Sequence, residues 1–438
     1  MGKMSDRKLY PWFIWLLAAT FFFVEYLARI APSIMVDDLM RVFSVGALAL
    51  GSLSAFFYYA YLGMQIPVGT LMDRYGPRKL LAVMAAITAT SCFLFSTSQH
   101  IWTANFARFL IGFGSAFAFV GALKIASVWF PARQFGLLAG LTQATGMAGA
   151  AFGEGPMSVF VAHFGWRKEI WTIGTIFLVL AILIGFFVRD NPTKIAKDGS
   201  QIIEKYKVGI FQALRIVFRN KQSWINSAYA GLIYAPTAAF AELWGVSYLS
   251  HVYGMDTEVA ASAISMIYIG WVFGGPLIGW WSDHFRQRKP LMYVSAIGSL
   301  LTMGTVLYSP NLPDWIVFIL LFFYGVFNTG VALSYAVAGE NNPHPVAGTS
   351  MAFCNMASVI IGAAFQPIIG WFLDLEWTGK IAKGVPVYTA QNFRYAMVAL
   401  PICLLIGIIV VYFIRETHCH TVETDEEFEK HHSVIENA

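Results

Sequence analysis

Long apolar segments recur along the whole chain and are separated by short polar ones. Twelve runs of about 20 apolar residues lie near 11–35, 46–70, 80–98, 103–127, 135–161, 168–188, 224–249, 262–281, 291–309, 314–338, 347–372 and 393–414. A helix needs roughly 20 residues to cross about 30 Å of hydrocarbon. The pattern therefore predicts an all-α integral membrane protein with twelve transmembrane helices.

One longer polar stretch divides these runs into six and six. It covers residues 189–223 and carries eight Lys or Arg residues. We therefore expect an N-terminal six-helix half at 1–188, a cytoplasmic linker at 189–223, and a C-terminal six-helix half at 224–416. The remaining residues, 417–438, are polar and are expected to form a disordered cytoplasmic tail.

Composition excludes a soluble protein. Hydrophobic residues make up 57% of the 438 residues and charged residues only 12%, whereas a soluble domain is about one-quarter charged. The four cysteines are scattered, which argues against a disulfide framework or a metal site. The net charge of +4 is too small to indicate a nucleic-acid partner. We expect no cofactor and no metal.

The distribution of basic residues predicts the orientation in the membrane. With the N-terminus in the cytoplasm, 20 of the 29 Lys and Arg residues lie on the cytoplasmic side, and six lie on the opposite side. Cytoplasmic loops are enriched in Lys and Arg. Both termini are therefore expected in the cytoplasm.

The two halves share a repeated loop. The segment "GTLMDRYGPRK" at 69–79 follows the second run, and "GWWSDHFRQRK" at 279–289 follows the eighth. A shift of 210 positions places Gly69 on Gly279, Asp73 on Asp283, Arg78 on Arg288 and Lys79 on Lys289. Internal repeats around a site at the membrane midplane are typical of secondary transporters.

These motifs resemble the major facilitator superfamily over residues 11–414. The loop residues Gly69, Asp73, Arg74, Gly76, Arg78 and Lys79 are similar to its signature loop, and "RFLIGFG", with Arg108, Gly112 and Gly114, is similar to a second signature in the fourth helix. The resemblance implies transport by alternating access, with the loops forming a latch between the halves in the outward-facing state. The alternative is that the loop charges only set topology. Small residues such as Gly69 also let helices approach closely.

Two charged residues interrupt the first apolar run. Glu25 and Arg29 lie four residues apart, so both occupy one helix face, and the aromatic neighbour Tyr26 is expected to cover an apolar or cationic part of a substrate. A charge at the centre of a membrane helix costs about 2.5–3.5 kcal/mol on insertion scales, so such residues usually face a cavity. We expect Arg29 to bind a substrate carboxylate or phosphate, and Glu25 to carry a proton or hold an amine. The alternative is a self-neutralising structural pair.

Polar residues at helical spacing in other runs outline the same central cavity. They are Gln143 and Glu154 in the fifth run, Tyr234 and Glu242 in the seventh, Tyr324 and Asn328 in the tenth, and Asn355 and Gln366 in the eleventh. Each set alone could instead serve helix–helix hydrogen bonding. Arg108 is expected to hydrogen-bond to the first helix.

The function classes separate on simple chemistry. No phosphate-binding loop of the type G-x-x-x-x-G-K-[ST] occurs, so an ion gradient is the expected energy source, and buried carboxylates favour protons. The apolar core contains no histidine to serve a hydrolase, so the chain is not expected to be an enzyme. A transporter-like sensor is a further alternative, and drug export is a minority one, because Gly155–Pro156 lacks the glycines expected after it.

The balance of intramembrane charges guides the expected cargo. One arginine with several carboxylates suits a small zwitterion, so we expect proton-coupled symport of an amino acid or similar nutrient across a bacterial inner membrane. The alternative is an organic anion, a sugar acid or a siderophore, bound by Arg29 with help from Lys124. The expected partners are the substrate, protons and the lipid bilayer, and the expected state is a monomer.

Overall fold

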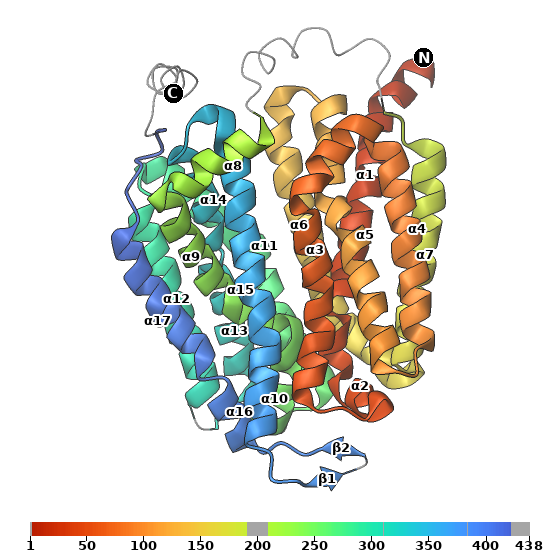
Figure 1. Cartoon of the computed structure of the whole chain (residues 1–438), viewed down its shortest axis with the longest axis vertical. Coiled ribbons are helices and arrows are strands. Elements are labelled where there is room, and N and C mark those ends of the chain that lie inside the picture. The colour runs from red at the N-terminus through yellow and green to blue at the C-terminus, as the bar shows by residue number, and fades with distance from the viewer. Residues whose placement is uncertain (1, 191–208, 310, 383, 422–438) are drawn as a thin grey trace.

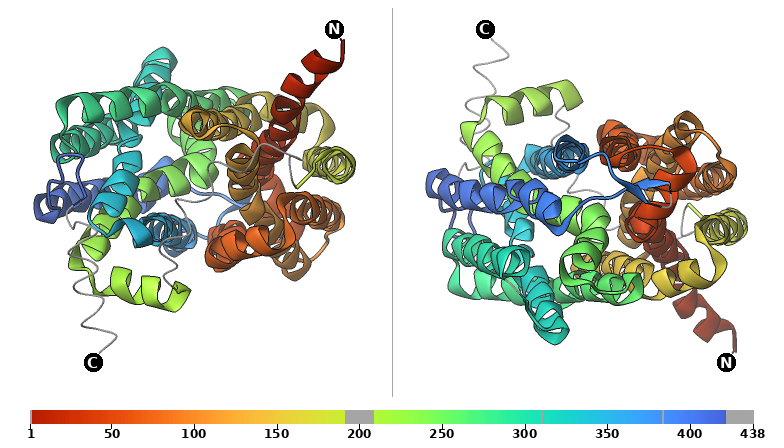
Figure 2. Two further views of the ribbon diagram at one scale, coloured as in Figure 1. Left: turned by 90° about the horizontal axis from the view of Figure 1, so that it is seen from above. Right: turned by 90° about the horizontal axis from the view of Figure 1, so that it is seen from below.

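The protein is a bundle of long helices arranged as two halves. A computed structural model describes residues 2–190, 209–309, 311–382 and 384–421. Figure 1 shows the halves side by side with their helices roughly parallel, and Figure 2 shows them along the helix axes as two separate clusters. The described chain starts and ends on one face, here called the terminal face. The opposite side carries a β-hairpin and is called the hairpin face.

The N-terminal half contains the first seven α-helices and one short 3₁₀ helix. They are α1 (Gly2–Ile30), η1 (Ala31–Met35), α2 (Val36–Phe43), α3 (Ala47–Tyr75), α4 (Pro77–Thr97), α5 (Ile101–Trp129), α6 (Ala132–Phe164) and α7 (Trp166–Phe187).

The C-terminal half repeats this plan with more interruptions. Its elements are α9 (Lys221–Pro236), η3 (Thr237–Trp244), α10 (Gly245–Tyr253), α11 (Thr257–Phe285), α12 (Lys289–Tyr308), α13 (Asp314–Asn328), α14 (Val331–Glu340), η4 (His344–Val346), α15 (Ala347–Leu375), β1 (Ile381–Ala382), β2 (Val385–Pro386), α16 (Ala390–Ala396) and α17 (Ala399–Phe413). The strands β1 and β2 pair antiparallel and form the hairpin.

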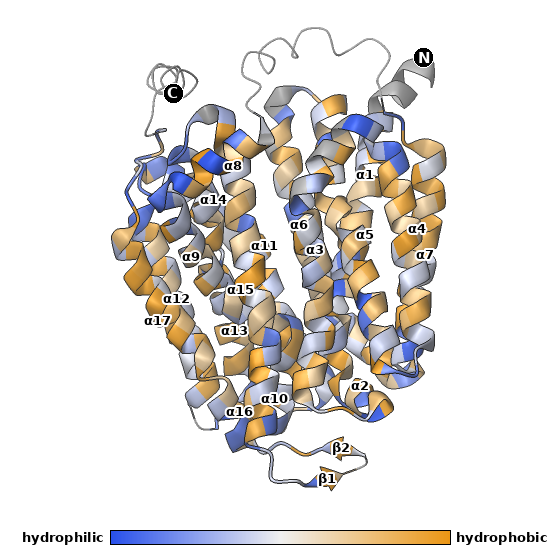
Figure 3. Cartoon of the chain, in the orientation of Figure 1, coloured by the Kyte–Doolittle hydropathy of each residue, from blue (hydrophilic) through white to orange (hydrophobic). Residues whose placement is uncertain are grey.

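The apolar surface of the bundle confirms a multi-pass membrane protein. Ten helices or helix runs within the described residues are long and apolar enough to span a bilayer. The two other expected spans coincide with α6 and with the run α9–η3–α10. Hydrophobic residues, orange in Figure 3, occur along the length of the helices, and the side chains of Trp102 and Phe186, for example, are more than 70% exposed. Lipid is the solvent that such a surface requires.

The first helix of each half is interrupted near its middle. In the N-terminal half, α1 gives way to the 3₁₀ helix η1, in which Pro32 lacks a backbone donor. In the C-terminal half, Pro236 ends α9, and the π-helix η3 follows it. The kink expected after Pro236 is therefore present. By contrast, α6 continues through Pro156, where a weakened helix was expected.

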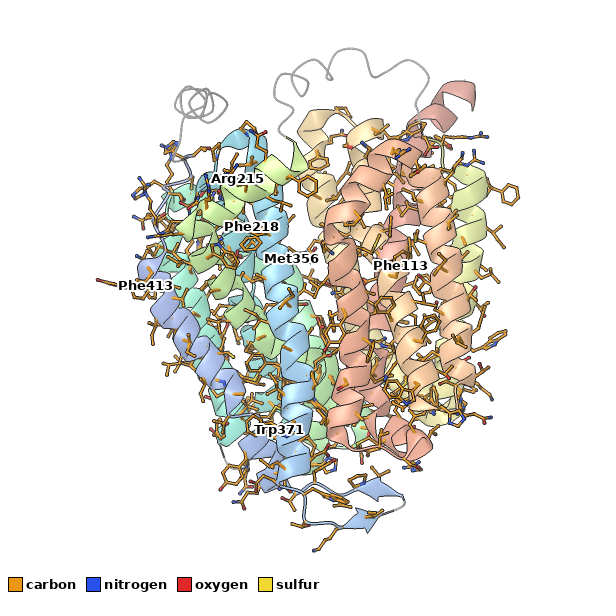
Figure 4. The ribbon with its side chains drawn as sticks, in the orientation of Figure 1. Phe113, Arg215, Phe218, Met356, Trp371 and Phe413 are labelled. Carbon is orange, nitrogen blue, oxygen red and sulfur yellow. The ribbon has the colours of Figure 1, made fainter. Side chains whose placement is uncertain are left out.

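A short amphipathic helix lies in the segment that the sequence predicts to be a linker. This helix is α8 (Ile210–Arg219), and it packs on α15 through Ala213 and Val217. Phe218 contacts Phe353 edge to face, with ring centroids 5.2 Å apart, and Figure 4 shows Phe218 beside Met356. The stretch 191–208 of the predicted linker lies outside the described residues.

The two halves are in tight contact near the hairpin face. A Cβ placed on Gly51 of α3 would lie 2.5 Å from the backbone oxygen of Gln366, and one on Gly370 of α15 would overlap the backbone of Ala47. The Asp374 carboxylate accepts hydrogen bonds from the backbone amides of Ala47 and Leu48, at 3.0 and 2.8 Å. It therefore caps the start of α3 from the other half and closes this face.

We predict that Gly51→Leu forces the halves apart at the hairpin face. Overpacking costs about 1–3 kcal/mol, and about 1.4 kcal/mol changes a population tenfold. In a background without the native cysteines, an Ala47→Cys reporter should therefore react roughly tenfold faster with a thiol reagent. Gly63→Leu is the matched control, because a Cβ at Gly63 meets no atom within 4 Å. Equal labelling of the two variants would contradict this account of the closed face.

Candidate functional site

A large cavity lies between the two halves and has a volume of about 900 Å³. It is lined by the middle and terminal-face parts of α1, α3, α5 and α6 on one side, and of α9, α11, α14 and α15 on the other. The contacts around Gly51 and Asp374 close the bundle at the hairpin face. The cavity therefore lies toward the terminal face.

The lining combines one charge with many aromatic rings and a few amides. Its main chemical groups are Arg29, Tyr26, Phe22, Tyr61, Gln65, Phe119, Gln143, Tyr234, Trp271, Tyr335, Asn355 and Ser358. Arg29 is the one charged side chain in the lining, as far as the described residues go. Of the predicted site, Tyr26, Arg29, Gln143, Tyr234 and Asn355 are thus brought together.

Arg29 is held by Glu25 one helical turn away. Its Nε and Nη2 donate to the same Glu25 oxygen, Oε1, at 2.9 and 2.7 Å. Glu25 is fully buried and lies outside the lining, and its Oε2 has no hydrogen-bond partner among the described residues. The pair is therefore self-neutralising, but only its positive member reaches the cavity.

Aromatic rings surround the Arg29 guanidinium. Its Cζ lies 4.4 Å from the ring centroid of Tyr26 and 5.0 Å from that of Tyr61. Phe57 and Tyr58 follow at 5.4 and 5.9 Å. The negative faces of these rings stabilise the cation and fix its direction. An anionic group entering the cavity would meet a guanidinium that is already oriented.

Arg108 supports this arrangement from α5, as the sequence predicts. Its Nη1 donates to the Ala28 carbonyl at 2.6 Å, and its Nη2 donates to the Arg29 carbonyl at 3.0 Å. Those carbonyls lie at the end of α1, where backbone oxygens have no amide donor within the helix. Close helix packing makes this reach possible, since a Cβ on Gly112 would overlap the Phe57 backbone and one on Gly114 would meet Met84 and Thr88.

Glu242 lies behind the cavity wall and joins the two halves. It is buried in η3 and accepts a hydrogen bond from Tyr234 Oη at 2.7 Å. Its second oxygen accepts from the Tyr58 hydroxyl of α3. Tyr234 lines the cavity and Tyr58 lies near Arg29, so Glu242 connects to the site through two tyrosines.

Glu154 lies apart from the cavity. It is fully buried in α6, and its Oε1 accepts a hydrogen bond from the Ser33 hydroxyl of η1 at 2.6 Å. Its Oε2 has no partner within the described chain. The expectation that Glu154 lines the same cavity as Arg29 is therefore wrong.

Three further predicted residues serve helix contacts. Asn328 Nδ2 donates to the Ile233 carbonyl, and the Thr237 hydroxyl donates to Asn328 Oδ1 while sharing a hydrogen bond with the Tyr324 hydroxyl. Gln366 Nε2 donates to the Ala238 carbonyl. Tyr324, Asn328 and Gln366 are thus buried between helices rather than in the cavity lining. The alternative of helix–helix hydrogen bonding holds for them.

Several lining residues escaped the sequence analysis. Tyr61 and Gln65 come from α3, and Trp271 comes from α11. The only available signal was the spacing of Tyr58, Tyr61 and Gln65, which places these residues near one helix face. Lys124, named for the organic-anion alternative, is absent from the lining.

The first signature loop lies on the terminal face. Gly76 has a φ of +78°, which favours glycine, and separates α3 from α4. The Arg78 amide donates to Asp190 at 2.9 Å, and its Nε donates to the Gly185 carbonyl at 2.8 Å. Arg74 and Lys79 are exposed, and the side chain of Asp73 lies outside the described part. The latch expected for Asp73 stays a prediction.

The second signature loop is held by an ion-pair network within its own half. Arg288 contacts Asp283 and Glu340, each at 2.7 Å. Although burial acts in the opposite direction, hydrogen bonds from Arg288 to Glu340 and Asp283 raise its pKa. Lys289 Nζ donates to the Tyr412 carbonyl at 2.7 Å.

The end of the predicted C-terminal half and the start of the predicted tail join this network, in which the Thr417 hydroxyl donates to Glu340 at 2.5 Å. Glu416 accepts hydrogen bonds from the backbone amides of Arg288 and Lys289, at 2.9 and 2.8 Å, and so caps the start of α12. Burial works against the charged form, but the backbone donors outweigh it and lower the pKa of Glu416. Residues 415–421 are therefore ordered against the bundle, and 422–438 lie outside the described residues.

The glycines that the two signature loops share have space around them here. A Cβ on Gly69 or on Gly279 would meet no atom within 4 Å. The expectation that Gly69 allows a close helix approach is therefore wrong for this conformation. Loose packing at these two positions agrees with a bundle that is parted at the terminal face.

Comparison with known proteins agrees with this architecture. The Major Facilitator Superfamily profile matches residues 14–367. The probable sulfoacetate transporter SauU of Cupriavidus necator is 23% identical, with coverage of 81% of this chain and 85% of the relative. The probable galactarate/D-glucarate transporter GudP of Bacillus subtilis is 24% identical, with 93% of each chain covered.

A solved structure shows the same fold. The bacterial homologue of the human lysosomal transporter Spinster, in an inward-facing and unoccupied conformation, superposes with a TM-score of 0.77. The two chains are 15% identical, and the match covers 92% of this chain and 97% of the other.

We predict that Tyr58→Phe weakens the junction between the halves. The change removes the donor to Glu242 and leaves a buried carboxylate oxygen unpartnered, which costs about 1–3 kcal/mol. The apparent free energy of unfolding in detergent should fall by that amount. Tyr59→Phe is the control, because Tyr59 is 48% exposed and should unfold like the parent. Equal stability of the two variants would argue against a Tyr58–Glu242 bond.

We also predict a pH-dependent contribution from Glu416. Because its pKa is lowered in the folded protein, its stabilising effect is present above the unfolded pKa and is lost as pH falls through the folded pKa. The melting temperature of Glu416→Gln should therefore lie below that of the parent at neutral pH and converge with it in acid. A difference that grows on acidification would contradict the assigned sign.

Proposed function

The chain belongs to the Major Facilitator Superfamily, and from that premise we propose that it is a secondary active transporter of a small organic anion. The observation that carries the proposal is the Arg29 guanidinium, which is the one charge that the described residues bring to the cavity lining, among aromatic rings and amides. The acids that favoured a zwitterion, Glu25, Glu154 and Glu242, all lie outside the lining. The cavity therefore offers a site for one negative group.

The chemistry of Arg29 suits a carboxylate or a sulfonate. Guanidinium groups bind such oxyanions through paired hydrogen bonds. Gln65, Gln143 and Asn355 are the lining amides available to neutral polar groups of the same solute. The relatives named for sulfoacetate and for galactarate/D-glucarate have cargo of this type.

A zwitterionic amino acid remains the second candidate. The rings of Tyr26 and Tyr61 face the cation of Arg29, and Tyr234 and Trp271 form another aromatic pair in the lining, with ring centroids 6.3 Å apart. Such a pair can accept an ammonium group through cation–π contact. Amino-acid uptake therefore stays a prediction beside the organic anion.

The direction of opening supports alternating access. The cavity reaches toward the terminal face, and the excess of basic residues predicts that this face is cytoplasmic. On this orientation we infer an inward-facing state, and we propose that the protein works as a monomer in a bacterial inner membrane. In the outward-facing state, the signature loops around Asp73 and Asp283 would close the terminal face.

Proton coupling is the proposed energy source. Burial favours the neutral, protonated form of a carboxyl group, so a buried acid can take up a proton from one side and release it on the other. Glu154, Glu169 and Glu242 are buried acids without a cationic salt-bridge partner among the described residues. We therefore expect symport driven by a proton gradient.

A ligand screen tests the cargo. Purified protein is scanned for thermal stabilisation by short sulfonates, sugar diacids, monocarboxylates, amino acids and choline, and stabilising compounds are then followed as labelled uptake into proteoliposomes. We expect stabilisation by organic anions. Stabilisation by choline or by amino acids alone would overturn the anion assignment.

Variants at Arg29 test the assigned contact. Loss of one partner of a charged hydrogen-bonded pair costs about 2–5 kcal/mol, so Arg29→Gln should reduce uptake roughly 30-fold or more. Arg29→Gln leaves the buried Glu25 without its ion-pair partner, which could also impair folding. The double variant Glu25→Gln/Arg29→Gln removes both charges and therefore separates an effect on binding from one on folding. It should also fail to bind the solute. Lys124→Gln is the matched control and should transport normally. Normal uptake by the double variant would refute the role of Arg29.

A further inference from the structure

A second group of buried acids lies away from the substrate cavity. Glu169 is in the first turn of α7, near the hairpin face, and is 1% exposed. Neither of its carboxylate oxygens has a hydrogen-bond partner in the described chain. Glu154 of α6 lies within electrostatic range of it. The cavity lining includes neither residue.

Other unpartnered polar groups point to the same region. Glu154 Oε2 has no partner, although Oε1 accepts from Ser33. The Tyr268 hydroxyl of α11 is also buried and unpartnered in the described structure, and it lies within electrostatic range of Glu154 and of Glu242. Three neighbouring buried side chains thus keep free hydrogen-bonding capacity, which is costly unless they bind something.

The basic residues that could neutralise Glu154 and Glu169 are bound to other groups. Among the described residues, no salt bridge reaches Glu154 or Glu169. On α1, Arg29 is paired with Glu25, and on α5, Arg108 is bonded to the carbonyls at the end of α1.

The remaining neighbours do not supply a cation either. The basic residues of α4, Arg78 and Lys79, lie in its first turn at the terminal face. On α7, the guanidinium of Arg167 donates to the Ser96 and Ser98 carbonyls. From α11, the group that faces Glu154 is the Tyr268 hydroxyl.

We propose that Glu154 and Glu169, with the Ser33 hydroxyl, form a proton-binding site that is separate from the substrate cavity. A carboxylate that is buried in a low-dielectric interior without a paired cation favours its neutral, protonated form, and both Glu154 and Glu169 are buried in this way. A proton on one or both of them removes a buried charge and supplies an O–H donor for the free oxygens. The site is the physical location of the coupling proton, and in this respect it rests on the proposed proton-coupled transport.

The position of the site gives the proton a way to influence the cavity. Ser33 belongs to η1, which directly continues α1 after Arg29. On the other side, Tyr268 belongs to α11, which packs along α6 across the boundary between the halves. Protonation at Glu154 therefore changes contacts of η1 and of the interface, although Glu154 itself lies outside the cavity lining.

The test needs no knowledge of the transported solute. Infrared difference spectra of the purified full-length protein between mildly acidic and alkaline pH report the carbonyl band of protonated carboxyl groups. We expect the band in the parent protein, a partial loss in Glu154→Gln or Glu169→Gln, and a larger loss in the double variant, in which the buried Glu242 still contributes. Glu376→Gln is the control, because Glu376 is exposed on the hairpin face and should leave the band intact. An unchanged band in the double variant would overturn the proposal.

Thermal unfolding supplies a second readout and tests another cation. The parent should lose stability as pH rises and the site gives up its proton, and the double variant should lack this alkaline step. The same unfolding is repeated in sodium chloride and in choline chloride. A stabilisation specific to sodium that disappears in the double variant would show that the site holds a metal cation instead of a proton, which overturns the proposal. Because neither readout uses substrate, failure here leaves the transport of an organic anion as it stands.

Discussion

The cost of placing a charge inside a membrane determines how the centre of this protein is built. Arg29 lies in the middle of a membrane helix, where an unpaired cation would cost several kcal/mol. Glu25 neutralises it from one turn away, and four aromatic rings lie around its guanidinium. Arg108 fixes the backbone that carries it. The charge facing the cavity is therefore set in place before any solute arrives, which lowers the ordering cost of binding.

The second constraint is that two halves must be able to part on either face. Glycine positions show how the contact is distributed in the present conformation. Gly51 and Gly370 are pressed against backbone of the opposite half near the hairpin face, while Gly69 and Gly279 have free space near the terminal face. Small residues allow helices to approach without side chains interlocking. We expect these two pairs to exchange roles when the transporter turns outward.

The sequence alone predicted the larger features of this architecture because they depend on strong, local signals. Run lengths reveal the spans, the 210-residue repeat reveals two halves, and the spacing of Glu25 and Arg29 reveals one shared helix face. The sequence did not predict how each helix is rotated about its axis, and therefore which of its residues face the cavity. Glu242 shows the reason, because it follows Pro236 within a π-helix whose wider turn changes which side of the helix faces the cavity.

Tertiary packing also decided the use of other polar residues. Asn328 and Gln366 bond to carbonyls of the interrupted run α9–η3, groups that only become available once that helix is broken. The sequence analysis missed Tyr61 and Trp271 because aromatic residues within an apolar run do not distinguish a cavity-facing side of the helix from a lipid-facing side. A lining made mostly of rings is therefore harder to predict than one made of charges.

The proposed transport, with separate sites for the proton and the solute, requires a mechanical link between the two sites. Binding at two sites is coupled only when both sites bias the same structural element. Here that element is the α1–η1 segment, since Arg29 ends its helical part and Ser33 of the 3₁₀ turn bonds to Glu154. A proton on Glu154 changes the carboxyl group to which Ser33 donates its hydrogen bond. A solute bound to Arg29 changes the electrostatic attraction between Arg29 and Glu25. Both events act on a segment that is already broken at Pro32, so a small change at either site can shift its packing against the opposite half.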